Sequence, residues 1–281
     1  MSGYKSIMRR LFERKIVIFG AGLVLFFVLV ALFAPYISPH DPYAMNLRLS
    51  FAKPSQKHLL GNDELGRDVL SRLIYGARTS LSIGFVAVLI ASVFGVVLGL
   101  VAGYVGGAVD GIICRVTDAL LSIPTLMLSV GLGLIFGSGQ TSLMIILGLS
   151  TVPTYVRLMR GQVLAVRESD FISAERVLGA STFRIMFSHV LPNCFSPILV
   201  ILTMNIGSTI LGEATLSFLG IGVKPPMPSW GAMVNEGYNR LLTNPVFGLA
   251  PGICIMLLVF GFNTLGDGLR DALDPRLRGK L

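Results

Sequence analysis

The sequence is poor in charged residues. Only 14% of its 281 residues are Asp, Glu, Lys or Arg, whereas a typical soluble domain has about 25%. Hydrophobic residues make up 53% of the chain, and the mean hydropathy is +0.75. A soluble protein of this length would have too few charges to cover its surface, so we predict that the lipid bilayer is its solvent.

Cysteine is also scarce. The three cysteines are an odd number, and each lies in an apolar run: Cys114, Cys194 and Cys254. This pattern provides neither a disulfide framework nor the spacing of a metal site. The net charge of +8 does not predict a nucleic-acid partner, because the positive residues flank hydrophobic runs, where they usually set membrane topology.

Several catalytic motifs are absent. The sequence has no phosphate-binding loop with Gly-Lys-Ser/Thr, no H-E-x-x-H and no G-x-S-x-G. Its histidines, His40, His58 and His189, lie in three different segments and form no evident metal or nucleophile set. We therefore predict no catalytic residue, no cofactor and no metal ligand. Two classes remain: a pore or carrier that runs on gradients, and a membrane subunit driven by a bound partner.

The main feature of the sequence is its long apolar runs. A membrane-spanning helix needs about 20 mostly apolar residues. The first run has 19 residues, which is longer than the core of a signal peptide (about 7–15), and no A-x-A cleavage site follows it. We therefore predict an all-α membrane protein with six transmembrane helices, at 16–34, 79–103, 112–137, 141–160, 194–222 and 246–266.

The distribution of Lys and Arg predicts the orientation. These residues cluster in the first 15 residues, in 157–190 and in the tail after the last span. Six spans place all three clusters on one side, which the positive-inside rule assigns to the cytoplasm together with both termini. The segment 39–78 lies on the opposite side although it has six basic residues, which conflicts with the rule.

The segment 39–78 divides the chain into three parts: the N-terminus with the first span (1–38), this external segment, and a core with five spans (79–281). Its prolines disfavour a continuous helix, and we expect one short helix near 65–77. The segment also has four charged residues whose sign alternates along the chain. They predict an ion-paired external cap or, alternatively, a solvated helix face whose pairs contribute about 0–1 kcal/mol each. They are Asp63, Arg67, Asp68 and Arg72.

Small residues recur at four-residue spacing in the second span: Ala91, Gly95, Gly99 and Gly103. Such a row lies on one helix face and lets another backbone approach closely. Packing within this chain is the favoured interpretation, and contact with a second subunit is the alternative.

The third span and the loop after the fifth span also carry local signals. Arg115 and Asp118 are spaced to pair on one helix face, and Pro124 is expected to kink the third span or to end its first half. Trp230, the only tryptophan, follows the fifth span and is expected at the membrane interface.

The fifth span contains two polar residues, Asn205 and Glu213. A carboxylate inside a span is costly and usually faces protein or water. Both residues are therefore candidates for a translocation pathway. The alternatives for Glu213 are a structural hydrogen bond or a position near the outer membrane surface.

Between the fourth and fifth spans lies a polar segment, "SDFISAERVLGASTFRIMFSHVLPN" (169–193). Its pattern predicts two short helices joined at Gly179, with Pro192 beginning the next helix. A simple channel has no evident need for such a segment with exposed apolar residues, so we predict that a partner docks on it. An amphipathic connector that lies on lipid headgroups is the alternative.

This segment resembles the cytoplasmic loop signature of ABC importer permeases. Ala174, Gly179 and the Leu191-Pro192 pair match the signature, whereas Ser173 and Glu175 stand where the family usually has an acid and an alanine. The stretches 58–81, 216–237 and 263–279 resemble dipeptide/oligopeptide permeases of the C type. The resemblance covers about residues 12 to 280.

The resemblance implies a multi-pass permease of the type I importer fold in the cell inner (cytoplasmic) membrane. It implies three kinds of partner besides the lipid bilayer: a second homologous permease, two cytoplasmic ABC ATPases, and an extracytoplasmic solute-binding protein. The loop at about 161–192 would dock on an ATPase as a coupling helix through Phe171, Ser173, Ala174, Glu175, Arg176, Gly179, Ala180, Leu191 and Pro192.

The cargo implied by the resemblance is a dipeptide or oligopeptide, with nickel chelates, glutathione or short oligosaccharides as alternatives. The gradient-driven carrier or channel needs a relay of several intramembrane acids. The spans contain essentially one, Glu213, together with Asp118 near a span end.

Overall fold

A computed structural model describes residues 14–273, and its regular elements in this range are all helices. The basic residues predicted to flank the bundle at positions up to 13 and from 274 onward lie outside the described residues. The longer helices are α2 (Lys15–Ile37), α3 (Val69–Val105), α4 (Gly107–Leu121), α5 (Thr125–Phe136), α6 (Gln140–Arg167), α9 (Leu191–Phe218) and α11 (Pro245–Leu273). The shorter elements are η1 (Leu47–Leu49), α7 (Asp170–Val177), α8 (Thr182–Arg184), the π-helical η2 (Ile185–Val190) and α10 (Trp230–Tyr238).

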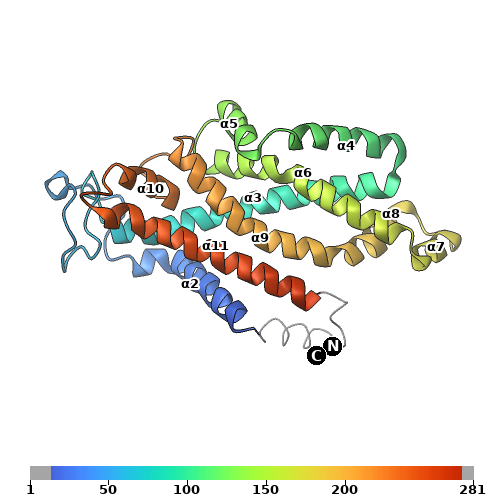
Figure 1. Cartoon of the computed structure of the whole chain (residues 1–281), viewed down its shortest axis with the longest axis horizontal. Helices are drawn as coiled ribbons and strands as arrows, with labels where there is room; N and C mark the ends of the chain where they lie inside the picture. Colours follow the sequence, from blue (N-terminus) through green and yellow to red (C-terminus); the bar gives the residue numbers. More distant parts are fainter. Residues whose placement is uncertain (1–13, 274–281) are drawn as a thin grey trace.

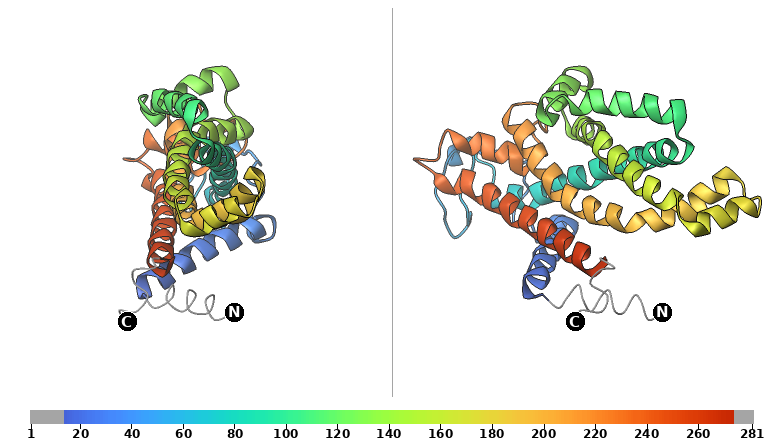
Figure 2. Two further views of the ribbon diagram at one scale, coloured as in Figure 1. Left: turned by 90° about the vertical axis from the view of Figure 1, so that its right-hand side faces the viewer. Right: turned by 45° about the vertical axis from the view of Figure 1, so that its right-hand side comes forward.

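The long helices run roughly along one axis (Figure 1). At one extremity lie α10 and the irregular segment 38–68, and at the other lie α7 and α8, an arrangement that Figure 2 shows from two further sides. We call these the α10 end and the α7 end. The two are thus separated by the length of the bundle.

The predicted spans agree with the helices. Within residues 14–273, five helices are long and apolar enough to cross a membrane: α2, α3, α6, the run 182–218 that ends in α9, and α11. The third predicted span is a broken pair, α4 and α5, which are bent by 95° at their junction. Pro124 stands at that junction as the N-cap of α5. The expectation that this proline ends the first half of the span is confirmed.

The predicted pairing of Arg115 with Asp118 is wrong, because α4 pairs with α6 instead. Arg157 Nη2 lies 2.6 Å from Asp118 Oδ1, and Arg160 donates Nε and Nη2 to the two oxygens of Asp110 at 2.6 and 2.7 Å. Antiparallel neighbours bring these side chains together across a long sequence separation, which local spacing does not reveal.

The row of small residues in α3 is the seam between α3 and α6. A Cβ atom built on Gly99 would lie 2.6 Å from the carbonyl oxygen of Val156, and one on Gly103 would lie 2.8 Å from Val163 Cβ. The absence of side chains in this row therefore allows the two helices to touch. Packing within the chain, the favoured interpretation of the row, is confirmed.

The irregular part of the external segment is shorter than 39–78. Asp68 caps α3, its Oδ2 accepting the Ser71 N–H at 2.8 Å, and the helix then continues without a break for 37 residues. The short helix expected near 65–77 is therefore the first part of α3. An aspartate directly before an apolar periodic run is a strong N-cap signal, and it places the helix start at Val69.

Trp230 is not an interface residue. Its side chain is buried at 1% exposure, its Nε1 donates to the carbonyl oxygen of Leu73 at 2.9 Å, and its ring contacts that of Phe27 edge-on at 5.3 Å. Gly76 provides the space, since a Cβ atom there would lie 2.8 Å from the indole. Trp230 is therefore buried because Gly76, on a helix far away in the sequence, leaves room for its ring.

Candidate functional site

The first candidate site is α7, at the extremity of the molecule (Figure 1). Gly179 ends α7 with a left-handed backbone, φ +78°. Ala180 N–H donates to the Glu175 carbonyl and Gly179 N–H to the Arg176 carbonyl, both at 3.0 Å. This pair of bonds is the Schellman motif, in which glycine is favoured at the left-handed position. The expected break at Gly179 is therefore present.

Ile172 is the side chain that inserts from α7 into the bundle. Ile172 is fully buried and belongs to a cluster with Met159, Val163 and Ile185. Four large apolar side chains at this end are exposed: Phe171 and Val177 on α7, Leu178 directly after it, and Phe183 on α8, at 45%, 88%, 80% and 71%. We call them the apolar face of α7. Large exposed apolar patches of this kind mark interaction sites.

The other predicted docking residues are distributed over two elements. Ser173, Ala174 and Arg176 are exposed on α7, while Glu175 and Ala180 are half-buried. The guanidinium of Arg176 lies over the ring of Tyr104 at 5.6 Å. Leu191 packs against the buried cluster of Ile172 rather than on the exposed face. Val177, Leu178 and Phe183 are exposed beside the predicted docking residues but were not among them, although their apolar character in a polar segment was a visible signal.

Pro192 lies in the first turn of α9, as predicted, but α9 is not separate from the helical turns before it. The chain is helical without interruption from Thr182 to Phe218. Proline lacks an N–H and its ring collides with the carbonyl four residues earlier in an α-helix. Here the preceding turn is a π-helix, in which Leu191 N–H donates to Met186 O five residues back. The wider turn accommodates the proline, so the second short helix expected after Gly179 is the beginning of the fifth span.

The second candidate site is a hollow of about 430 Å³ between α5, α6 and α9. Asn205 lines it, and Asn205 Nδ2 donates to the Tyr155 hydroxyl at 2.9 Å. Several small hydroxyl residues share the wall but no charged residue does. The surface is thus weakly polar and uncharged, and its polar members are Thr125, Ser129, Thr151, Asn205, Ser208, Thr209 and Thr215.

Glu213 does not line this hollow. Its carboxylate is fully buried and accepts hydrogen bonds from Ser80 Oγ at 3.0 Å and Ser217 Oγ at 2.8 Å. Ser80 Oγ also accepts the Trp230 N–H at 3.3 Å. The carboxylate therefore joins α3, α9 and α10, which is the geometry of the structural alternative.

The third candidate site is a buried ionic cluster at the α10 end. Asp63 Oδ2 lies 2.6 Å from Arg67 Nε and 3.2 Å from Arg72 Nε. Glu236 Oε2 lies 3.6 Å from Arg67 Nη2 and 3.4 Å from Arg72 Nη2. Both arginine side chains and Asp63 are at most 2% exposed, so the solvated-face alternative is wrong for them.

Glu236 was missed by the sequence analysis, and its signal was weak: it is a lone acid in the loop after the fifth span. Burial raises the pKa of its carboxyl, while the positive charges of Arg72 and Arg67 act in the opposite direction. The positive charges of the two arginines balance the negative charges of the two acids. The cluster thereby holds α10 against the start of α3.

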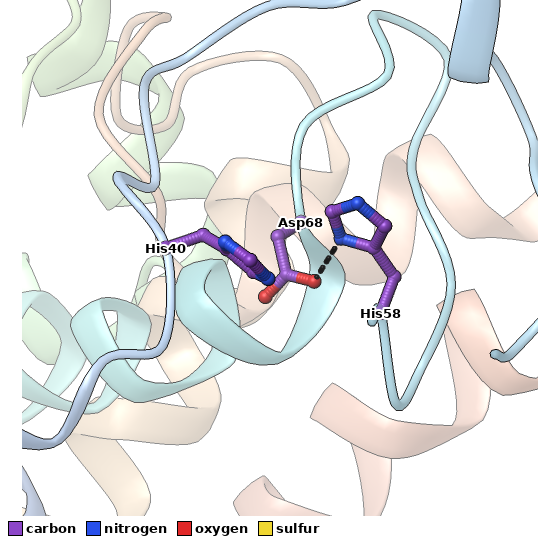
Figure 3. Close-up of side chains that lie close together, drawn as sticks. All are labelled: His40, His58 and Asp68. Carbon is purple, nitrogen blue, oxygen red and sulfur yellow. Dashed lines mark hydrogen bonds and ion pairs between the residues drawn. The ribbon is translucent and has the colours of Figure 1, made fainter. Parts of the chain in front are cut away.

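Asp68, the fourth predicted cap residue, lies apart from this cluster. Its Oδ1 pairs with His58 Nδ1 at 2.9 Å, and the His40 ring lies 4.7 Å from the His58 ring (Figure 3). The histidines were expected to lie in three different segments, but the structure brings these two together. They belong to one irregular segment that folds back on itself, which their separation in sequence conceals.

Two family comparisons cover most of the chain. Residues 95–279 match the binding-protein-dependent transport system inner membrane component. Residues 2–54 match the N-terminal transmembrane domain of oligopeptide transport permease C.

Curated proteins match the chain over nearly its full length. A dipeptide transport system permease protein of Alkalihalophilus pseudofirmus is 40% identical, covering 99% of this chain and 91% of the relative. A glutathione transport system permease protein of Salmonella paratyphi A is 41% identical, covering 98% and 91%. A putative peptide transport system permease protein of Brucella suis is 40% identical, covering 96% and 91%.

A solved structure has the same fold. The MetNI methionine ABC transporter, described in inward-facing conformations, matches with a TM-score of 0.60 and 20% identity, over 72% of this chain and 97% of the other. Subunits of this kind are not enzymes, since partner ATPases hydrolyse the ATP. The chain belongs to the family of binding-protein-dependent transport system inner membrane components, as a multi-pass permease subunit of an ABC importer.

Proposed function

We propose that this subunit imports dipeptides or oligopeptides as one of two homologous permeases, together with two ATPases and an extracytoplasmic solute-binding protein. The names of the relatives support a peptide cargo. Glutathione, a tripeptide, is the second candidate cargo, because a relative of similar identity is a glutathione permease. Both cargoes share a peptide backbone with charged ends.

The α7 end is proposed to face the cytoplasm. Five arginines lie on the last turns of α6 or on the segment that follows: Arg157, Arg160, Arg167, Arg176 and Arg184. Positive residues are retained on the cytoplasmic side. The α10 end then faces outward, where a binding protein delivers cargo.

In this orientation, the exposed apolar face of α7 docks on an ATPase subunit. A helix that transmits force needs a rigid connection to the spans, and Ile172 provides one through its cluster with α6 and η2. The four large apolar side chains of the face are Phe171, Val177, Leu178 and Phe183. Their burial against a partner would contribute about 1.5–3 kcal/mol for each fully covered side chain.

The hollow beside α9 is proposed as this subunit's share of the translocation pathway. Its wall is uncharged and carries small hydroxyls and Asn205, groups that can hydrogen-bond a passing peptide without holding it by charge. The second permease would close the open side.

One observation carries the proposal: a single uninterrupted helical run, 182–218, begins beside α7 and ends in the wall of the hollow. A displacement of α7 by a partner would therefore be transmitted along one rigid element to the pathway. No separate linkage is needed.

Affinity purification of the tagged chain from its own host in mild detergent tests the assembly. Recovery of a homologous permease, phosphate-loop ATPases and a binding protein is expected. The reconstituted complex should take up labelled dipeptides or glutathione only with ATP, and the preferred cargo should be that of the binding protein. Recovery of the chain alone, with flux that needs a gradient and no ATP, would refute the proposal.

A further inference from the structure

His40, His58 and Asp68 form a compact set of donor atoms at the α10 end (Figure 3). One donor atom from each residue can be chosen so that all three lie within 4.8 Å of one another. The residues come from three places: the turn after α2, the middle of the irregular segment, and the N-cap of α3. The set therefore joins parts of the chain that no helix holds together.

Hydrogen bonds hold the donors in place. Ser71 Oγ donates to Asp68 Oδ2 at 2.7 Å and accepts the backbone N–H of His40 at 3.1 Å. The His40 ring bonds to the Lys57 carbonyl through Nε2 at 2.8 Å. Outer partners of this kind orient the ligands in metal sites. Asp68 Oδ2 is thus engaged in capping, which leaves Oδ1 directed at His58.

The neighbouring arginines do not compete for this carboxylate. Arg67 and Arg72 are paired with Asp63 and Glu236. Among the described residues, the ion-pair partner of Asp68 is His58. Its side chain is 2% exposed and that of His58 is 13% exposed, so the set is shielded from bulk water without being closed.

Two imidazole nitrogens and one carboxylate oxygen are a donor set that suits zinc. Bonds of about 2.0–2.1 Å in a tetrahedral site place ligand atoms about 3.3 Å apart. The donor atoms here span up to 4.8 Å, so a small rotation of a partly exposed imidazole closes the site. The ligating nitrogen of each imidazole must be unprotonated, so the proton of the neutral ring lies on its other nitrogen.

We propose that His40, His58 and Asp68 bind one Zn²⁺ ion, with water in the fourth position. The ion fastens the irregular segment 38–68 to the first turn of α3. It is a structural site at the outward face that is independent of cargo and of ATP. Zinc would raise the stability of this end of the permease, because the unfolded segment does not hold the three donors together.

The test uses the full chain in mild detergent, purified through a tag without histidine and stripped with a chelator. Co²⁺ serves as the probe, because tetrahedral Co²⁺ absorbs visible light, and Zn²⁺ is then titrated to displace it. The variants are His40→Gln and His58→Gln. The matched control is His189→Gln, since His189 is the remaining histidine and lies at the α7 end. Fluorescence of the buried Trp230 reports whether each variant is folded.

One equivalent of Co²⁺ with tetrahedral absorption, displaced by Zn²⁺, is expected in the unmodified chain and in His189→Gln. Loss of an outer partner alone weakens metal binding about 10–100-fold, so removal of a ligand should weaken it at least about 100-fold. Zn²⁺ should raise the unfolding temperature of the unmodified chain and not that of His40→Gln. Two results would overturn the proposal: an unmodified chain that binds no Co²⁺ or Zn²⁺, or metal binding that survives in His40→Gln. His40 is a suitable position because the hydrogen bond of its ring is to the Lys57 carbonyl. If no metal binds at all, His58 and Asp68 form a metal-free pair.

Discussion

Replacement of Gly179 tests whether the shape of the α7 end drives transport. At φ +78° a residue with a Cβ atom is strained by about 1–2 kcal/mol. A Cβ built there meets nothing within 4 Å, so collision adds no further cost. This strain lowers the population of the native turn about 5–30-fold relative to competing local conformations. Ile172 is the fully buried side chain of α7, and its contacts do not offset strain at Gly179.

The assay compares peptide uptake and ATP hydrolysis by the reconstituted complex. Gly179→Val is expected to lower uptake per ATP by up to that factor, while insertion and thermal stability of the bundle stay unchanged. Gly179→Asn should remain close to the unmodified protein, because asparagine tolerates the left-handed region. Gly22→Ala, in an open position of α2, is the control.

Two outcomes would refute the reasoning. If the valine variant couples uptake to hydrolysis as well as the unmodified protein does, the geometry of α7 is irrelevant to coupling. If the asparagine variant fails as badly as the valine variant, backbone strain is not the cause.

Three further predictions concern stability, measured as thermal unfolding in detergent. Gly99→Ala should lower the free energy of unfolding by about 1–3 kcal/mol by forcing α3 away from α6, and Gly22→Ala should leave it almost unchanged. Equal effects of the two substitutions would contradict close packing of α3 on α6 at Gly99. Arg72→Ala should cost about 3–5 kcal/mol because it leaves buried acids uncompensated, whereas Asp118→Asn, in an exposed pair, should cost at most about 1 kcal/mol; a reversed order would refute the burial argument. Glu213→Ala should cost about 1–3 kcal/mol by leaving the hydroxyls of Ser80 and Ser217 unpaired, with ATP-driven uptake per folded complex retained; lost uptake at unchanged stability would favour a role in the pathway.

The helical spans could be predicted from the sequence because each is a local property. A run of about 20 apolar residues has one stable solution in a bilayer, since a helix satisfies its own backbone hydrogen bonds. Pro124 likewise ended a helix for a local reason. The predictions for Asp118 and Trp230 failed because their outcome depended on partners more than 30 residues away, Arg157 and Leu73.

The site divides in the same way. The polar segment 169–193, its break at Gly179 and its resemblance to an importer loop were visible in the residues themselves. The exposure of its side chains could not be predicted from the residues, because Ile172 and Leu191 turn inward and Val177 turns outward only in the packed bundle.

The sequence by itself determined that the chain is a helical membrane protein with no nucleotide chemistry of its own, since composition and missing motifs do not depend on folding. Only the tertiary structure decided that Glu213 holds three helices together, that Glu236 compensates two buried arginines, and that His40 and His58 meet at Asp68. The physical reason is that a charge or a ring nitrogen acts over a few ångströms, and folding alone sets which residues come that close.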